Sequence, residues 1–287
     1  LFIVGANSQI LYSDDNGKTW SAPDLISKQI KDERETFVGA APGRGLAVTL
    51  ADGTERILFC VYDNMGTFHD PVFENASVIY TDDNGATWHR SGEIFHKLGL
   101  GKTSEAQLVE LPGGIIRMYA RNNSNFICYA DSTDGGRTWS DFVADEDLEG
   151  TKNCMVSFIN TGKVINGKSV ILCSAGSNLQ SRADGVIRVG LVDEATRDVD
   201  WITTYHFKAG FFGYSCLTEL ADGNFGILYE DEAAHIQYMI FSVDANGNVS
   251  EINGNNDEFK SNLSFWDQIV IFFKGIFSRI LAMLNML

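Results

Sequence analysis

Arginine is the residue type with which this chain could bind an anion. The sequence has 22 Lys and Arg against 38 Asp and Glu, a net charge of −16. Such an acidic surface repels polyphosphate, which argues against nucleic-acid binding, and it also repels small anions. A site for an anionic substrate would therefore need a local cluster of arginines.

Histidine and cysteine, the usual metal ligands, form no recognisable pattern. There are five of each, and no two cysteines form a Cys-x-x-Cys pair. The odd number of cysteines also argues against a disulfide framework, so buried free thiols are expected. We predict no metal site and no organic cofactor.

Three copies of one short motif indicate which elements would position a site. They read SDDNGKTW (13–20), TDDNGATW (81–88) and STDGGRTW (132–139). Asp-Asn-Gly and Asp-Gly-Gly favour tight turns, the hydroxyls can close the same loop, and the Trp can cover it. The motif, an Asp-box, stabilises a turn and carries no chemistry of its own.

Short apolar segments surround these boxes, and they are rich in Val, Ile, Tyr and Phe. Besides the stretches just before each box, the expected strands are 56–62, 114–120, 169–173, 185–192, 226–229 and 236–243. No long amphipathic helix is expected before about residue 262. Strand hairpins that return about every 50 residues predict an all-β fold, a β-propeller of four-stranded blades.

The last part of the chain differs in composition. Residues 253–264 are expected to form a polar linker after a propeller domain at 1–252, and residues 265–287 an amphipathic helix. Asp267, Lys274, Ser278 and Asn285 fall on one narrow face of that helix, which argues against a membrane span. A helix that binds a membrane surface or a partner is favoured over one that caps the propeller edge.

Beyond the boxes, several segments resemble the bacterial exo-sialidases (neuraminidases). They are GAAPGRG (39–45), SEAQLVEL (104–111), YARN (119–122), SRADG (181–185), GYSCL (213–217) and LYE (228–230). The resemblance extends to about residue 252. It implies a six-bladed β-propeller and an enzyme that releases terminal sialic acid with retention of configuration.

The resemblance also implies which residues act. Sialic acid carries a carboxylate on its anomeric carbon, which would repel a carboxylate nucleophile, and sialidases use a neutral Tyr instead. The matching positions are Tyr214 as nucleophile and Glu105 as its base, because a Tyr hydroxyl with a pKa of about 10 needs one. The two should lie within about 2.6–3.2 Å.

Three arginines hold the substrate carboxylate in the family, since a guanidinium binds a carboxylate through two parallel hydrogen bonds. Arg121 and Arg182 match two of them and should point into the same cleft. Glu230 matches the acid that orients the remaining arginine.

Each assignment has an alternative. Tyr214 could be a core tyrosine, Arg121 a surface charge, and Glu230 a partner of a surface cation. Glu110 competes with Glu105, but it stands in a strand pattern before Pro112. Arg188, slightly later in the chain, is an alternative to Arg182 as the second carboxylate-binding arginine.

Two parts of the family pattern have no match. The first-blade Arg-Ile-Pro motif is absent. Arg56-Ile57-Leu58 looks similar, but it follows the 39–45 loop and belongs to a later blade. The aspartate that acts as acid and base is also unmatched. We therefore expect an N-terminally truncated propeller of four to five blades, whose 287 residues alone lack sialidase activity.

The predicted function is that of an exo-α-sialidase, a glycoside hydrolase acting on sialylated glycoproteins, glycolipids or oligosaccharides outside the cell or at its surface. Three alternatives remain: a non-catalytic sialic-acid-binding propeller, a trans-sialidase, and a structural Asp-box propeller. The combination of Glu105, Arg121, Arg182 and Tyr214 argues against the last of these.

Overall fold

The computed structural model describes residues 2–5, 8–33, 35–67, 70–91, 102–150, 153–232 and 235–252. The predicted linker (253–264) and helix (265–287) lie outside them. Within the described residues the helices are single turns, α1 (Ser27–Ile30) and the 3-10 helix η1 (Pro112–Gly114). No helix found there has the length and hydrophobicity needed to cross a bilayer.

The strands of the described residues form five antiparallel sheets, each made of strands consecutive in the chain. The first sheet has three strands: β1 (Phe2–Gly5), β2 (Gln9–Tyr12) and β3 (Asp24–Leu25). The second has five: β4 (Glu35–Ala40), β5 (Leu46–Thr49), β6 (Glu55–Thr67), β7 (Asp70–Thr81) and β8 (His89–Arg90).

The other three sheets have four strands each. The third contains β9 (Ala106–Leu111), β10 (Ile115–Ala120), β11 (Phe126–Ser132) and β12 (Val143–Glu149). The fourth contains β13 (Ser157–Ile165), β14 (Lys168–Gly176), β15 (Ala183–Val192) and β16 (Val199–Phe211). The fifth contains β17 (Ser215–Glu219), β18 (Phe225–Glu230), β19 (Ile236–Val243) and β20 (Val249–Glu251).

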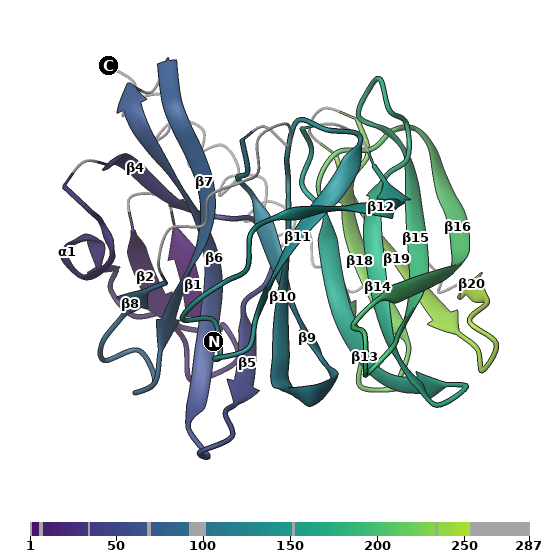
Figure 1. Cartoon of the computed structure of the whole chain (residues 1–287), viewed down its shortest axis with the longest axis horizontal. Coiled ribbons are helices and arrows are strands. Elements are labelled where there is room, and N and C mark those ends of the chain that lie inside the picture. Colours follow the sequence, from purple (N-terminus) through teal and green to yellow (C-terminus); the bar gives the residue numbers. More distant parts are fainter. Residues whose placement is uncertain are drawn as a thin grey trace. The chain divides into compact units, whose positions relative to one another are not determined.

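Successive sheets pack face to face, in the order of the chain (Figure 1). β13 contacts both β9 and β17, so the first strands of these sheets are neighbours and the fourth strands lie outside. Hydrophobic clusters fill the spaces between sheets, as where Tyr119 stacks on Phe158 with ring centroids 3.8 Å apart. This is the blade arrangement of a β-propeller, and the predicted fold class is confirmed.

The segments predicted as strands lie in strands. Residues 236–243 form β19 with the predicted limits, and the other five segments fall in β6, β10, β14, β15 and β18. The one residue outside is Gly114, which ends η1. Central strands such as β10 and β15 are buried on both faces and therefore contain runs of apolar residues. Such runs can be recognised in the sequence.

All three Asp-boxes adopt the same hydrogen-bonded turn between the last two strands of a sheet. The first Ser or Thr hydroxyl donates to the Asp at 2.8–2.9 Å, and the second Thr hydroxyl donates to the same carboxylate at 2.6 Å. The Trp indole N–H closes the loop on the Gly carbonyl at 3.1–3.2 Å. Hydrogen bonds from Thr19 and Thr87 lower the pKa of Asp15 and Asp83 to about 2.

A fourth turn resembles the boxes although its sequence does not fit the motif. Between β19 and β20, the Asp244 carboxylate accepts the Asn248 backbone N–H at 2.8 Å and the Asn248 side-chain amide at 2.9 Å. Asn248 thus replaces the Thr of the motif. The motif does not include this turn, because the motif has Thr and Trp at fixed positions.

Arg56 connects two neighbouring blades through two boxes. Its side chain is fully buried and donates twice to Asp82 of the second box, at 2.6 and 2.7 Å, and once to the Gly135 carbonyl of the third, at 2.7 Å. The guanidinium also lies 4.1 Å from the centroid of the Tyr80 ring. Arg56 is therefore a structural residue, as its position in a later blade predicts.

We expect Arg56→Met to lower the free energy of unfolding by about 3 kcal/mol, because it removes one partner of a largely buried ion pair. Arg137→Met is the matched control. Arg137 approaches the same Asp82 at 3.8 Å but is half exposed, so its loss should cost less than about 1 kcal/mol. Urea unfolding of both variants measures the difference, and equal costs would contradict the structural role of Arg56.

Candidate active site

The predicted site residues lie at one end of their strands. Glu105 comes just before β9 and Arg121 just after β10, where Ala106 pairs with Ala120. Tyr214 comes just before β17 and Glu230 ends β18 beside it. Arg182 comes just before β15. Antiparallel pairing thus places residues 16 positions apart at the same end of one sheet, and packing of the sheets brings together those more than a hundred positions apart.

Tyr214 and Glu105 are in direct contact. The Tyr214 hydroxyl donates to Glu105 Oε1 at 2.7 Å, within the expected range. Arg121 Nη1 donates to the same hydroxyl at 3.0 Å and to Glu105 Oε2 at 2.5 Å. One guanidinium therefore holds the expected nucleophile and the expected base together, while their catalytic roles remain predictions.

The surroundings of Tyr214 keep its hydroxyl protonated. Burial, together with the hydrogen bond to Glu105 and the charge of Glu105, raises its pKa to about 12, although Arg121 and Arg182 act in the opposite direction. At neutral pH the group is a phenol. A reaction that used this oxygen as a nucleophile would have to remove its proton, and Glu105 is the acceptor in contact with it.

Arg121 and Arg182 converge on the same place, as predicted. The Arg182 guanidinium carbon lies 5.3 Å from the centroid of the Tyr214 ring. Both arginines also contact Asn153: Arg121 Nε donates to its side-chain oxygen at 2.8 Å, and Arg182 Nη2 donates to its backbone carbonyl at 3.2 Å. Asn153 was missed at the level of sequence, where no motif or spacing marks it.

Glu230 contacts the backbone of the expected nucleophile. Its Oε2 accepts the Tyr214 backbone N–H at 3.0 Å. The preceding residue is Gly213, and a Cβ there would collide with the same oxygen, so the contact requires glycine. Among the described residues no arginine contacts the Glu230 carboxylate, so its predicted role in orienting one remains a prediction.

The competing residues lie elsewhere. Glu110 stands near the opposite end of β9, where it lines a different pocket. Arg188 is in the middle of β15, buried, and donates to the Glu149 carbonyl at 2.7 Å. The geometry therefore favours Glu105 and Arg182 over these alternatives.

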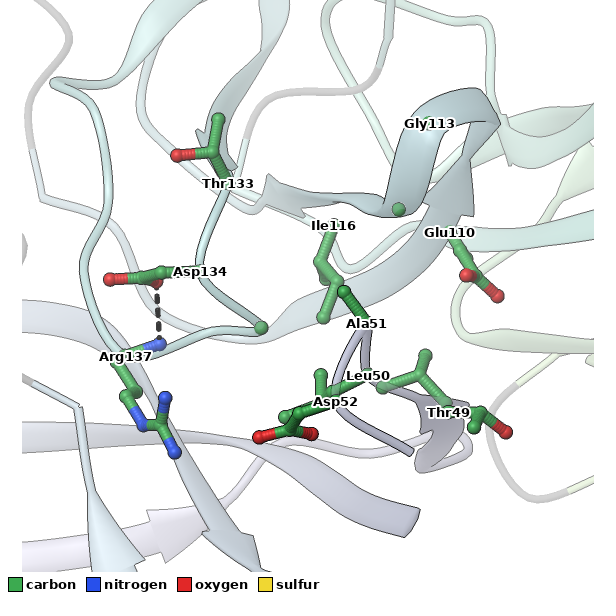
Figure 2. A pocket seen from close by; sticks show the side chains of 13 residues that line it. Thr49, Leu50, Ala51, Asp52, Glu110, Gly113, Ile116, Thr133, Asp134 and Arg137 are labelled. Atoms are coloured by element: carbon green, nitrogen blue, oxygen red, sulfur yellow. Dashed lines mark hydrogen bonds between the residues drawn. The ribbon is translucent and has the colours of Figure 1, made fainter. Parts of the chain in front are cut away.

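A pocket of about 300 Å³ lies at the other end of β9 and β10 and shares no residue with the candidate site (Figure 2). Its lining includes the apolar side chains of Leu50 and Ile116 and the polar side chains of Glu110, Asp134 and Arg137. The Asp134 carboxylate accepts the Arg137 backbone N–H at 3.0 Å as part of the third box. We assign no function to this pocket.

All five cysteines are free, and four of them are buried, as expected of structural thiols. No three His, Cys, Asp or Glu side chains lie close enough to hold a metal ion in the part of the chain that the structure describes.

Arg121→Lys should weaken the binding of a carboxylate ligand about tenfold or more, because an ammonium cannot replace a planar guanidinium that contacts three groups at once. Arg137→Lys, at the opposite end of the sheets, is the control and should bind normally. Calorimetric titration with N-acetylneuraminic acid measures both. Unchanged affinity of Arg121→Lys would contradict a role for Arg121 in binding the carboxylate.

Comparison with known proteins gives one family. The model of the BNR repeat-like domain matches residues 3–227. Among curated proteins, the chain is 35% identical over 228 residues to an anhydrosialidase from Macrobdella decora, covering 76% of this chain and 29% of the relative. It is 29% identical over 233 residues to a sialidase from Bacteroides fragilis, covering 79% of this chain and 40% of the relative.

Solved structures agree with this result. The intramolecular trans-sialidase from Ruminococcus gnavus, in complex with oseltamivir carboxylate, superposes with a TM-score of 0.73 at 32% identity. The match covers 84% of this chain and 51% of that protein. The chain thus spans between 29% and 51% of the length of these relatives.

Proposed function

Because the chain belongs to the sialidase family of BNR repeat-like domain proteins, we propose that it carries the nucleophile and the carboxylate-binding part of an exo-α-sialidase. The substrates would be sialylated glycoproteins, glycolipids or oligosaccharides, and their terminal sialic acid would be released with retention of configuration. The observation that carries the proposal is the Tyr214 hydroxyl, which lies 2.7 Å from Glu105 and 3.0 Å from Arg121.

In the first step, the Tyr214 oxygen attacks the anomeric carbon while its proton passes to Glu105 Oε1. A bond forms between the phenol oxygen and the sugar, and the bond from the sugar to the leaving oxygen breaks. Transfer of the proton during attack is needed because the pKa of Tyr214, about 12, keeps the hydroxyl intact beforehand.

In the second step, a water molecule attacks the same carbon from the opposite side and releases one proton to the solvent. The bond from the phenol oxygen to the sugar breaks, and the phenol recovers its proton from Glu105. Two inversions give net retention. The leaving oxygen must receive a proton in the first step, and we assign none of the described residues to that task. An aryl leaving group departs without such help. Aryl sialosides therefore test the roles of Tyr214 and Glu105 separately from protonation of the leaving group.

Arg121 and Arg182 would bind the substrate carboxylate beside the Tyr214 ring. A phenol is neutral where this carboxylate arrives, whereas an aspartate or glutamate nucleophile would repel it. Arg121 and Arg182 would be the local arginine cluster that a chain with a net charge of −16 needs in order to bind an anion.

A second candidate reaction is intramolecular transfer, in which a hydroxyl of the bound sialic acid replaces water and an anhydro sugar is released. It is favoured by the 35% identity to the anhydrosialidase and by the TM-score of 0.73 to the intramolecular trans-sialidase. The residues of the first step would be the same, so only the acceptor differs.

One experiment tests the proposal and separates the candidates. The chain is incubated with an aryl sialoside and with 3′-sialyllactose, and the products are identified by mass spectrometry. Free sialic acid supports hydrolysis, and a product lighter by one water supports intramolecular transfer. Binding of sialic acid without release of either product would support the sialic-acid-binding propeller, and it is also the outcome that the two unmatched parts of the family pattern predict for these 287 residues alone. Absence of binding would contradict all three.

Sialylated glycans are displayed outside cells, so we propose an extracellular or cell-surface location. Detection of the protein in the medium or at the surface of its source cells tests this location, and exclusive recovery inside the cells would contradict it.

A further inference from the structure

Asn153 contacts both arginines of the candidate site although it belongs to no motif. Its side-chain oxygen accepts Arg121 Nε at 2.8 Å, and its backbone carbonyl accepts Arg182 Nη2 at 3.2 Å. Its own backbone N–H donates to the Asn122 carbonyl at 2.9 Å, next to Arg121. A single residue thus joins two arginines that lie 61 positions apart in the sequence (121 and 182).

Asn122 gives this residue a rigid support. The Asn122 side chain is buried and donates to the carbonyls of Ala120 and Phe126 at 3.3 and 2.9 Å. Asn153 itself has a φ of 52°, in the left-handed region that Asn tolerates better than most residues. The backbone therefore brings both acceptors of Asn153 to the arginines.

The contacts of Asn153 leave selected N–H groups of the arginines available. Arg121 uses Nε for Asn153 and Nη1 for Glu105 and Tyr214, so its Nη2 forms no hydrogen bond with the described residues. Arg182 uses Nη2 for Asn153. The remaining N–H groups are donors that a ligand carboxylate can accept from both arginines.

The amide is also the right chemical group for this position. An Asp would accept the same hydrogen bond but would place a negative charge beside the guanidinium pair and oppose an anionic ligand. A Gly would adopt the same φ but would leave Arg121 Nε without its acceptor.

We propose that Asn153 is a positioning residue that holds Arg121 and Arg182 as a preformed receptor for the carboxylate of sialic acid. The choice of sialic acid rests on the proposed function, whereas the positioning of Arg121 does not. Asn153 acts through the two arginines and takes no part in bond making.

The test compares Asn153→Gly, Asn153→Asp and Asn166→Gly in the whole chain. Asn166 is the matched control, because it has a φ of 51° in the β13–β14 turn, away from the site. Two quantities are measured: the affinity for N-acetylneuraminic acid by calorimetry, and the hydrogen exchange of the Arg121 Nε–H by nuclear magnetic resonance.

Asn153→Gly should weaken binding about tenfold through the loss of a charge-assisted hydrogen bond and should speed exchange of the Arg121 Nε–H. Asn153→Asp should keep the Nε–H protected yet also weaken binding, because of its charge. Asn166→Gly should change neither quantity.

Wild-type affinity or unchanged Nε–H exchange in Asn153→Gly would overturn the positioning role. A wild-type chain that binds no sialic acid would contradict the proposed function and the choice of ligand. In that case the Nε–H exchange of the variants would still decide whether Asn153 positions Arg121.

Discussion

In a protein that turns over an aryl sialoside through this site, Tyr214→Phe should abolish formation of the covalent sialyl-enzyme and lower that turnover at least about 10³-fold. The variant lacks the oxygen that attacks, while the ring beneath Arg182 remains. Affinity for sialic acid should therefore change little, since the arginines bind the carboxylate. A fluorinated sialosyl fluoride, which slows the second step, should trap the wild-type chain, and mass spectrometry should locate the adduct on Tyr214.

Tyr205→Phe is the control for this experiment. Tyr205 packs against the cluster between the fourth and fifth sheets and is not part of the site. It should leave trapping and turnover unchanged. An adduct on any residue other than Tyr214, or normal turnover by Tyr214→Phe, would refute the role of Tyr214 as nucleophile.

Glu105→Gln should lower turnover of the same substrate about 10²- to 10⁴-fold at neutral pH, as expected for the loss of a general base. The hydrogen bond and the charge of Glu105 both raise the pKa of Tyr214, so the substitution should lower that pKa from about 12. Ionised Tyr214 needs no base, and its fraction grows as the pH rises toward its pKa. Turnover by the variant should therefore increase with pH through the alkaline range.

A pH–rate profile of Glu105→Gln and of Glu110→Gln measures this effect. Glu110 lies near the opposite end of the same strand, so its variant should keep the wild-type rate and profile. A Glu105→Gln profile parallel to that of the wild type would show that Glu105 does not accept the proton of Tyr214.

Many of the turns and strands could be predicted from local patterns in the sequence. The boxes indicated the turns correctly because their Ser, Asp, Thr and Trp side chains bond to residues within four positions, so no distant contact is needed. Strands such as β19 were found because burial on a blade requires apolar side chains. By contrast, Asp244 and Asn248 form the same kind of turn from other residues, which the motif could not reveal.

Tertiary structure decided what the candidate site contains. The types and local context of Glu105, Arg121, Arg182 and Tyr214 were readable in the sequence through a family resemblance, but their mutual distances depend on how the blades pack. Asn153 had no signal of its own, because it is defined by the side chain that it meets, Arg121. Gly213 belongs to a segment that resembles the family (213–217), but its contact with Glu230 is visible only in the structure. The sequence by itself determined which residues could react, through their chemical type. Packing of the sheets decided which of them meet, because contacts between residues more than a hundred positions apart leave no local pattern in the sequence.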